Sequence, residues 1–272
     1  MKIGSIEITS LVDGEIRVPP ADTYADVAPE RWAEHPDRLD AQGHVEFTTG
    51  GYLVRTGEHT VLVDLGAGFD PPVPFTGGTL LDRLAEVGTA PEDVDHVIIT
   101  HLHFDHIGWA SRDGRVVFPN AEHHLHLRDW EFFVDSAYVP MPMERAQDLP
   151  ANRLAPLKDH VTRFTGRVDV VPGVRLRPAP GHTPGTTIVE LESGGERGLL
   201  LGDVAHSAVE LLLDGWPGIA DVDAVQARRT AAEVAAELVE TGVPFALAHA
   251  PGLTWTRLVE EQGRRSLVVL GR

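Results

Sequence analysis

Cysteine is absent from this chain of 272 residues, so disulfides, thiolate metal ligands and a cysteine nucleophile are all excluded. Long apolar runs are also missing, since no stretch reaches the roughly 18 consecutive apolar residues that a membrane-spanning helix needs. The N-terminal segment has no apolar run of the length found in secretory signal peptides. We therefore expect a cytoplasmic protein without a membrane partner.

Basic residues are scarce: 23 Lys and Arg stand against 41 Asp and Glu, which gives a formal net charge of −18. A general nucleic-acid binder is normally basic, because contacts with phosphates supply most of its affinity. We therefore expect no nucleic-acid partner, and a small neutral molecule is favoured as substrate. With cysteine missing, the 14 histidines are the residues left for metal and proton chemistry.

The hydrophobic pattern indicates strands first and then strands that alternate with helices. Helices are predicted from Thr79 to Gly88 and over residues 223–240. Short β-branched or apolar runs predict strands over residues 3–11, 51–55, 60–65, 94–100, 116–118, 122–127, 174–177, 186–192, 199–201, 245–248 and 267–270. No repeat of fixed period is present. This order favours mixed sheets with helices outside over a uniform βαβ array.

Two irregular segments, residues 19–47 and 129–150, are rich in aromatic residues and proline. Their aromatic density favours packing against another part of the molecule over a solvated loop. We predict that they form lids or pocket walls. A dimer contact is the alternative, so a homodimer remains open.

Metal-type side chains follow directly after the buried run at residues 94–100. His101, His103, Asp105 and His106 lie within six residues. Strand alternation sends His101 and His103 to the same side, as a shared metal ion requires, and Asp105 and His106 follow where the chain turns. Imidazole and carboxylate groups suit zinc and other first-row metals. The spacing therefore predicts a metal site.

The stretch from His101 to His106 is similar to the HxHxDH signature of the metallo-β-lactamase-fold hydrolases. Further blocks resemble the family's motifs in the same order: Pro180-Gly181-His182-Thr183-Pro184-Gly185, Leu200-Leu201-Gly202-Asp203 and Leu247-Ala248-His249-Ala250-Pro251. An early Asp-Thr-Gly element is matched at Asp64-Leu65-Gly66, with Leu replacing Thr. The resemblance covers about residues 46–252 and points to the branch of lactonases and organophosphate hydrolases.

This resemblance implies a fold of the α/β (α+β) class, a four-layer αββα sandwich of two mixed sheets with helices on the outer faces. It also implies one domain over residues 1–272. Two divalent ions per chain are expected, with zinc first and manganese, iron or cobalt also fitting these ligands. The family pattern assigns His101, His103 and His182 to one metal, Asp105, His106 and His249 to the other, and Asp203 to both.

The expected reaction is cleavage of a small neutral ester or lactone by a hydroxide that bridges the two metals. Asp105 is the candidate for carrying a proton to the departing alkoxide. Asp64 and Thr100 are expected to orient the ligand loop from outside. His206 is a further catalytic candidate, because a tyrosine that contacts the substrate carbonyl stands near this position in quorum-signal lactonases. A structural role for His206 is the alternative.

The other histidines are not expected to bind metal. His123, His124 and His126 lie on a predicted strand without matching carboxylates. The sequence shows no group of metal-type side chains around the remaining histidines, which are His35, His44, His59, His96 and His160.

Other activities of the same fold remain as alternatives. A glyoxalase-II-like thioesterase uses the same ligands, but only Arg264-Arg265 offers a basic pair for a glutathione or coenzyme A tail. A phosphotriesterase or phosphodiesterase is a second alternative, and the negative charge disfavours the phosphodiesterase, whose substrates are anionic. Asp203 and the missing cysteine disfavour a β-lactamase. His103 disfavours an iron-dependent oxidoreductase, since flavodiiron members carry Glu there. The rival outside enzymes is a binding protein that retains its metal site.

Overall fold

The structure is a computed structural model that describes residues 1–24, 27–35, 38–136, 138–213, 216, 218 and 220–270. Five positions of the two aromatic segments lie outside the described residues, namely Ala25, Asp26, Pro36, Asp37 and Ala137.

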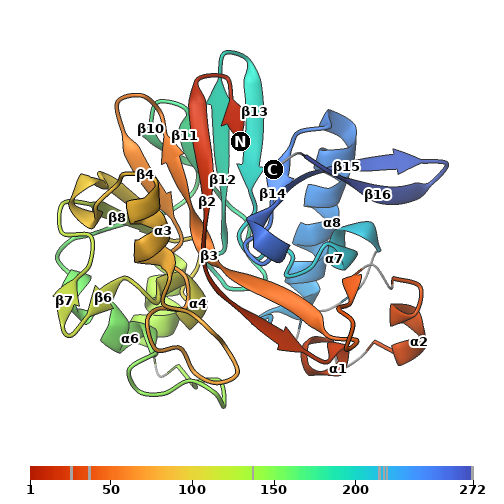
Figure 1. The fold of residues 1–272 in the computed structure, drawn as a ribbon, viewed down its shortest axis with the longest axis horizontal. Helices are drawn as coiled ribbons and strands as arrows, with labels where there is room; N and C mark the ends of the chain where they lie inside the picture. Colours follow the sequence, from red (N-terminus) through yellow and green to blue (C-terminus); the bar gives the residue numbers. More distant parts are fainter. Residues whose placement is uncertain are drawn as a thin grey trace.

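Most of the described strands belong to two seven-stranded sheets (Figure 1). The first sheet has the order β1-β2-β3-β4-β5-β8-β9 and is antiparallel up to β4 and parallel from β4 to β9. Its strands are β1 (Lys2–Ile3), β2 (Ile6–Val18), β3 (Val45–Arg55), β4 (Thr60–Val63), β5 (His96–Ile98), β8 (Glu122–His126) and β9 (Val161–Phe164).

The second sheet runs in sequence order from β10 to β16 and is antiparallel except between β13 and β14. Its strands are β10 (Val168–Val171), β11 (Val174–Pro178), β12 (Thr187–Ser193), β13 (Glu196–Leu200), β14 (Phe245–Ala246), β15 (Trp255–Glu261) and β16 (Arg264–Val269). A separate hairpin pairs β6 (Ser111–Arg112) with β7 (Arg115–Val116). Both large sheets are therefore mixed, as predicted.

The helices are short apart from α8. The α-helices are α1 (Pro20–Thr23), α2 (Pro29–Trp32), α3 (Leu80–Glu86), α4 (Phe104–Ile107), α5 (Leu127–Trp130), α6 (Pro150–Arg153), α7 (Val209–Leu212) and α8 (Ala224–Thr241). Single turns of other helix types are η2 (Pro91–Asp93), η3 (Glu131–Asp135), η4 (Ala155–Leu157) and η5 (Pro251–Leu253). None of the helices in the described ranges has the length and apolarity that crossing a membrane requires.

Alternation along the strands divides the interior into layers. Val61 and Val63 of β4 belong to the core between the two sheets, whereas Leu62 belongs to the core beneath α3. On the other side of the molecule, Leu238 of α8 packs with Leu199 of the second sheet. Helices thus cover the outer face of each sheet (Figure 1), which confirms the predicted sandwich.

Helix α8 shows how closely the local sequence determines an element. The Asp223 side chain accepts hydrogen bonds from the backbone N–H groups of Val225 and Gln226, and Gly242 ends the helix at a φ of 62°. Its buried face consists of Ala227, Thr230, Ala231, Val234, Ala235 and Leu238. Strands β9, β10 and β15 were not predicted, because they mix apolar residues with charged or polar ones and carry no long apolar run.

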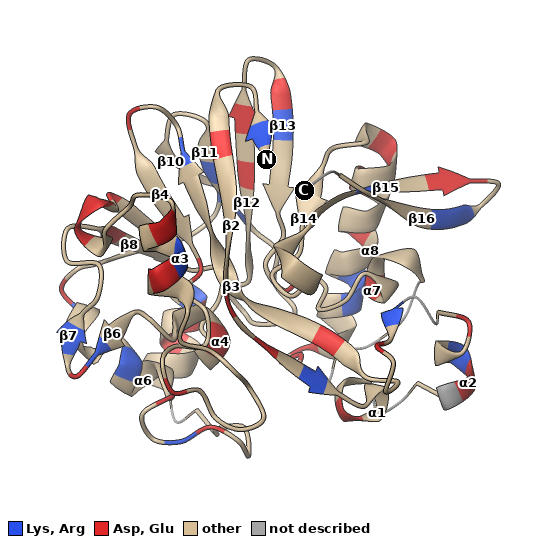
Figure 2. Ribbon diagram, in the orientation of Figure 1, with Lys and Arg blue, Asp and Glu red and all other residues tan. Residues whose placement is uncertain are grey.

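Charged residues are distributed unevenly over the ribbon. Figure 2 shows acidic residues on α3 and on the strands of both sheets, whereas Arg112, Arg115 and Arg153 bring basic charge to β6, β7 and α6.

Candidate metal centre

The predicted ligand loop, residues 101–106, begins after the end of β5 and continues into α4. Asp64, which follows the neighbouring strand β4, accepts hydrogen bonds from the backbone N–H and the hydroxyl of Thr100, both at 2.8 Å. Since β4 and β5 are parallel neighbours, their carboxyl ends meet at one edge of the sheet. The loop is therefore anchored at its first residue.

Three histidines meet through their ring nitrogens. His101 Nε2 lies 3.1 Å from His103 Nδ1. His182 Nε2 lies 3.2 Å from His101 Nε2 and 2.8 Å from His103 Nδ1. All three side chains are buried. Two nitrogens bound to one tetrahedral zinc at about 2.0–2.1 Å would lie roughly 3.3 Å apart. The spacing of the trio is therefore that of ligands around one small cation.

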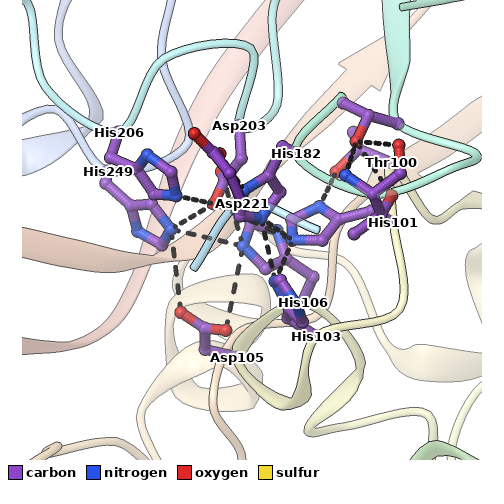
Figure 3. Close-up of polar contacts among 12 residues, drawn as sticks. Thr100, His101, His103, Asp105, His106, His182, Asp203, His206, Asp221 and His249 are labelled. Carbon is purple, nitrogen blue, oxygen red and sulfur yellow. Dashed lines mark hydrogen bonds and ion pairs between the residues drawn. The ribbon is translucent and has the colours of Figure 1, made fainter. Parts of the chain in front are cut away.

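A second group lies beside the first. His106 Nε2 is 3.3 Å from His249 Nε2, and the two oxygens of Asp105 lie 3.9 Å from His106 Nε2 and 3.7 Å from His249 Nε2. In Figure 3 the Asp105 carboxylate faces both rings. These three residues were predicted together from the resemblance, and the fold brings them together.

Asp203 lies between the two groups. Its Oδ2 is 3.0 Å from His249 Nε2 and 3.5 Å from His182 Nε2, and its Oδ1 is 3.5 Å from His106 Nε2. Oδ1 is buried without a hydrogen bond among the described residues. A buried carboxylate oxygen that faces imidazole nitrogens without a hydrogen bond is satisfied by a cation. The donor set therefore fits two metal ions that share Asp203.

Oxygen atoms orient four of the rings from behind. The pairs are His101 Nδ1 with Thr100 Oγ1 at 3.2 Å, His106 Nδ1 with Asp64 Oδ2 at 3.0 Å, His182 Nδ1 with Asp221 Oδ1 at 3.1 Å and His249 Nδ1 with the Thr48 carbonyl oxygen at 3.0 Å. Such partners fix the tautomer and leave Nε2 free to bind a metal. Thr100 and Asp64 were predicted in this role, whereas Asp221 and Thr48 were not.

The charge states suit metal binding. Burial holds the pKa of His101, His103 and His182 well below the ordinary value, so these imidazoles are neutral and offer lone pairs. Burial alone would raise the pKa of Asp203, but the adjacent His249 and His106 hold it well below its usual range. Burial alone would lower the pKa of His106 and His249, but the adjacent Asp203 carboxylate raises the pKa of both. A divalent cation bound beside Asp203 would take the place of those protons.

His206 borders this cluster. Its Nε2 lies 3.8 Å from Asp203 Oδ2, its Nδ1 lies 3.5 Å from Glu210 Oε1, and its ring stacks parallel to His249 at a centroid distance of 6.4 Å. Glu210 also accepts hydrogen bonds from the backbone N–H groups of His206 and Ser207. The structure thus places His206 beside the predicted ligands (Figure 3), with the Glu210 carboxylate near the other side of its ring.

Asp129 is a further member of the site that the sequence did not reveal. Its buried carboxylate accepts hydrogen bonds from Leu102 N at 3.2 Å, Thr183 Oγ1 at 2.9 Å and Gly185 N at 2.6 Å. It therefore ties the loop of His101 and His103 to the loop of His182. Burial raises its pKa to about 7. The only signal in the sequence is an acid placed at the start of an aromatic segment.

Both aromatic segments reach the cluster. The ring of Phe133 lies 5.5 Å from that of His103, Tyr138 packs against Phe133 at 4.8 Å, and the ring of Phe47 lies 6.1 Å from that of His249. A cavity of 200 Å³ is lined by His206 and His249 together with residues of segment 19–47, η5 and the hairpin of β15 and β16.

The prediction that His96 and His124 have no partners for a metal site is wrong. The parallel pairing of β5 with β8 places His96, Glu122 and His124 within reach of one another. His123 points to the opposite face of β8 and is fully buried. Because the sequence did not establish which strands pair, it could not show this cluster.

Comparison with known proteins identifies the family. Residues 51–246 match the family described as the metallo-beta-lactamase superfamily. An N-acyl homoserine lactonase of a Bacillus species is 29% identical over 163 residues, which cover 53% of this chain and 59% of the relative. A probable metallo-hydrolase of Mycobacterium tuberculosis is 30% identical over 179 residues, which cover 57% of this chain and 56% of the relative. The match spans less than two thirds of each curated relative.

Solved structures share the whole architecture. AidC, a dizinc quorum-quenching lactonase solved with a product, superposes with a TM-score of 0.89 at 22% identity, covering 100% of this chain and 97% of that one. The hydrolase AbOPH of the beta lactamase superfamily superposes with a TM-score of 0.86 at 24% identity, also covering 100% and 97%. At these identities the likeness shows the fold.

Proposed function

The chain belongs to the metallo-beta-lactamase superfamily, and we propose that it is a binuclear metal-dependent hydrolase of small neutral lactones or esters. The observation that carries this proposal is the convergence of five histidines and two aspartates, from loops far apart in the sequence, on one buried point (Figure 3). Hydrogen bonding within the protein does not account for such a group, because the imidazole nitrogens face each other and Asp203.

We assign one metal position to His101, His103 and His182, the other to Asp105, His106 and His249, and Asp203 to both. Divalent cations held there would lower the pKa of water and polarise a carbonyl group, which is the chemistry that ester hydrolysis needs. Zinc is our first choice of ion, because the ligands are nitrogen and oxygen atoms at tetrahedral spacing.

The residues around the centre divide the remaining work. Asp105 is the most exposed of the predicted carboxylate ligands, with a side chain 11% exposed against 3% for Asp203. It is therefore placed to pass a proton to the departing alkoxide. His206, held by Glu210, presents its Nε2 to the same space and would orient the substrate carbonyl. Asp64 and Asp129 keep the ligand loops in place.

The choice of substrate rests on three observations. The Bacillus relative and AidC are lactonases, the net charge of −18 disfavours polyanions, and the cavity beside His206 and His249 is lined partly by apolar side chains. A small neutral lactone fits all three. We place segments 19–47 and 129–150 as walls of the substrate pocket, because Phe47 and Phe133 approach the ligand histidines.

A substrate panel tests this proposal. The zinc-loaded chain would be offered N-hexanoyl homoserine lactone, γ-butyrolactone, an aryl ester, a thioester, a phosphotriester and bis(p-nitrophenyl) phosphate. We expect the highest kcat/KM on a lactone, loss of activity with a chelator, and recovery with Zn²⁺ or Mn²⁺. His103→Ala should be inactive, whereas His160→Ala, a change at an exposed histidine, should match the parent. Absence of metal-dependent lactone and ester hydrolysis would overturn the assignment.

A further inference from the structure

A second cluster of metal-type side chains lies on the first sheet, at the opposite end of β5 from the ligand loop. His96 opens β5, and Glu122 and His124 lie on the neighbouring parallel strand β8. His96 pairs in register with Glu122, and His124 follows two residues later on the same face of the strand. Strand pairing thus brings all three side chains to one point.

The ligand atoms of this cluster converge. His96 Nδ1 lies 3.1 Å from His124 Nε2, and Glu122 Oε2 lies 4.0 Å from each of these nitrogens. The side chains of His96, Glu122 and His124 are 17%, 50% and 8% exposed, so the site is open to solvent on the carboxylate side. The distance between the two nitrogens matches those within the trio of His101, His103 and His182.

Neighbouring residues orient the cluster. The Thr162 hydroxyl on β9 donates a hydrogen bond to Glu122 Oε1, which leaves Oε2 turned towards the two histidines. The ring of His59 lies 5.6 Å from that of His96, between centroids. A carboxylate held on its far oxygen by a hydroxyl is the usual arrangement behind a metal ligand.

A hydrogen bond between two imidazoles would explain the short distance between His96 and His124. It does not explain why a carboxylate oxygen lies equally far from both nitrogens. Burial lowers the pKa of His124 to about 4 and also lowers that of His96, while the hydrogen bond from Thr162 lowers the pKa of Glu122. At neutral pH the cluster therefore combines two neutral imidazoles with one carboxylate, the states that bind metal.

We propose that His96, Glu122 and His124 form a separate site for one divalent transition-metal ion of the zinc class, with water in the fourth position. Two imidazoles and one carboxylate are a known three-ligand set for zinc. The ion would link β5 to β8 on the edge away from the hydrolytic centre. Because one ligand is half exposed and only three protein ligands are present, this site should bind zinc more weakly than the centre built on Asp203.

Native mass spectrometry of the zinc-saturated chain tests the proposal. We expect Glu122→Gln and His124→Gln to bind one zinc ion fewer per chain than the parent, with unchanged hydrolysis. Glu131→Gln and His160→Gln, which alter exposed residues of the same types, should bind as many ions as the parent. Glu122 lies at the surface, so its variant keeps the test valid if His124→Gln fails to fold.

Equal zinc counts in the parent and in Glu122→Gln would overturn the second site. The comparison does not depend on the proposed hydrolase, because it measures a difference of one ion whether the larger centre holds two ions or fewer. Loss of hydrolysis in Glu122→Gln together with an unchanged zinc count would also contradict the proposal. It would show that the cluster supports the catalytic centre and binds no ion of its own.

Discussion

Asp64 Oδ2 lies 3.0 Å from His106 Nδ1, and the same carboxylate holds the backbone and hydroxyl of Thr100. Through these contacts one side chain on the loop after β4 sets the start of the ligand loop and the orientation of a predicted ligand ring.

We therefore expect Asp64→Ala to weaken zinc binding by about 10- to 100-fold, as loss of such outer partners usually does. Competition with a chromophoric chelator measures the change. Asp113→Ala is the matched control, because the side chain of Asp113 is 84% exposed. An unchanged affinity in Asp64→Ala would contradict the role assigned to this carboxylate.

Asp129 offers a second test, because it joins two ligand loops. Asp129→Ala leaves the buried N–H groups of Leu102 and Gly185 without an acceptor, which should lower the free energy of unfolding by about 2–4 kcal/mol. Urea unfolding checks this value, and Glu131→Ala, an exposed acid two residues away, should change it little. A loss below about 0.5 kcal/mol would show that water replaces the carboxylate at no cost.

His206 can be tested by separating turnover from metal content. If its imidazole orients the substrate carbonyl, His206→Phe should lower kcat/KM on a lactone by about 100-fold without changing the number of bound metals. His206→Tyr supplies a hydroxyl as hydrogen-bond donor, which phenylalanine lacks, and should recover part of the loss in kcat/KM. A metal count that falls in His206→Phe would show instead that His206 is a ligand, since it also lies near His182 and Asp203.

The lowered pKa of the buried His123 should make the free energy of unfolding depend on pH. Burial lowers its pKa from 6.5 to about 4, so between these values the unfolded chain binds a proton that the folded chain does not. The stability that the neutral ring contributes is complete above pH 6.5 and is lost as the pH falls towards 4, by at most about 1.4 kcal/mol per pH unit. His123→Phe should remove this part of the slope in urea unfolding. Parallel curves for variant and parent between pH 7 and pH 5 would refute it.

The predicted ligands came from contiguous motifs. His101, His103, Asp105 and His106 lie together at a strand end, and the blocks around His182, Asp203 and His249 each contain their own turn or strand signal. The same resemblance implied the sandwich, and the order of strands and helices predicted mixed sheets with helices outside. Local sequence was sufficient because each motif places its side chain within a few residues of the element that supports it.

The contacts that the sequence did not reveal depend on pairing over long distances. Asp129 on α5, the carbonyl of Thr48 on β3 and Asp221 before α8 contact the centre from positions that only the folded chain defines. The cluster of His96 and His124 depends on β5 lying beside β8, although the two histidines are 28 positions apart in the sequence. A strand prediction without sheet order cannot supply such neighbours.

Anomalous X-ray scattering at the zinc edge, measured on crystals of the zinc-loaded chain, tests the central claim most directly. We predict two peaks at the buried centre, one bounded by His101, His103 and His182 and the other by Asp105, His106 and His249. Both peaks should lie at about 2.0–2.2 Å from oxygens of Asp203. A single peak at this centre, or no peak within coordination distance of Asp203, would contradict the binuclear centre on which the proposed hydrolysis rests.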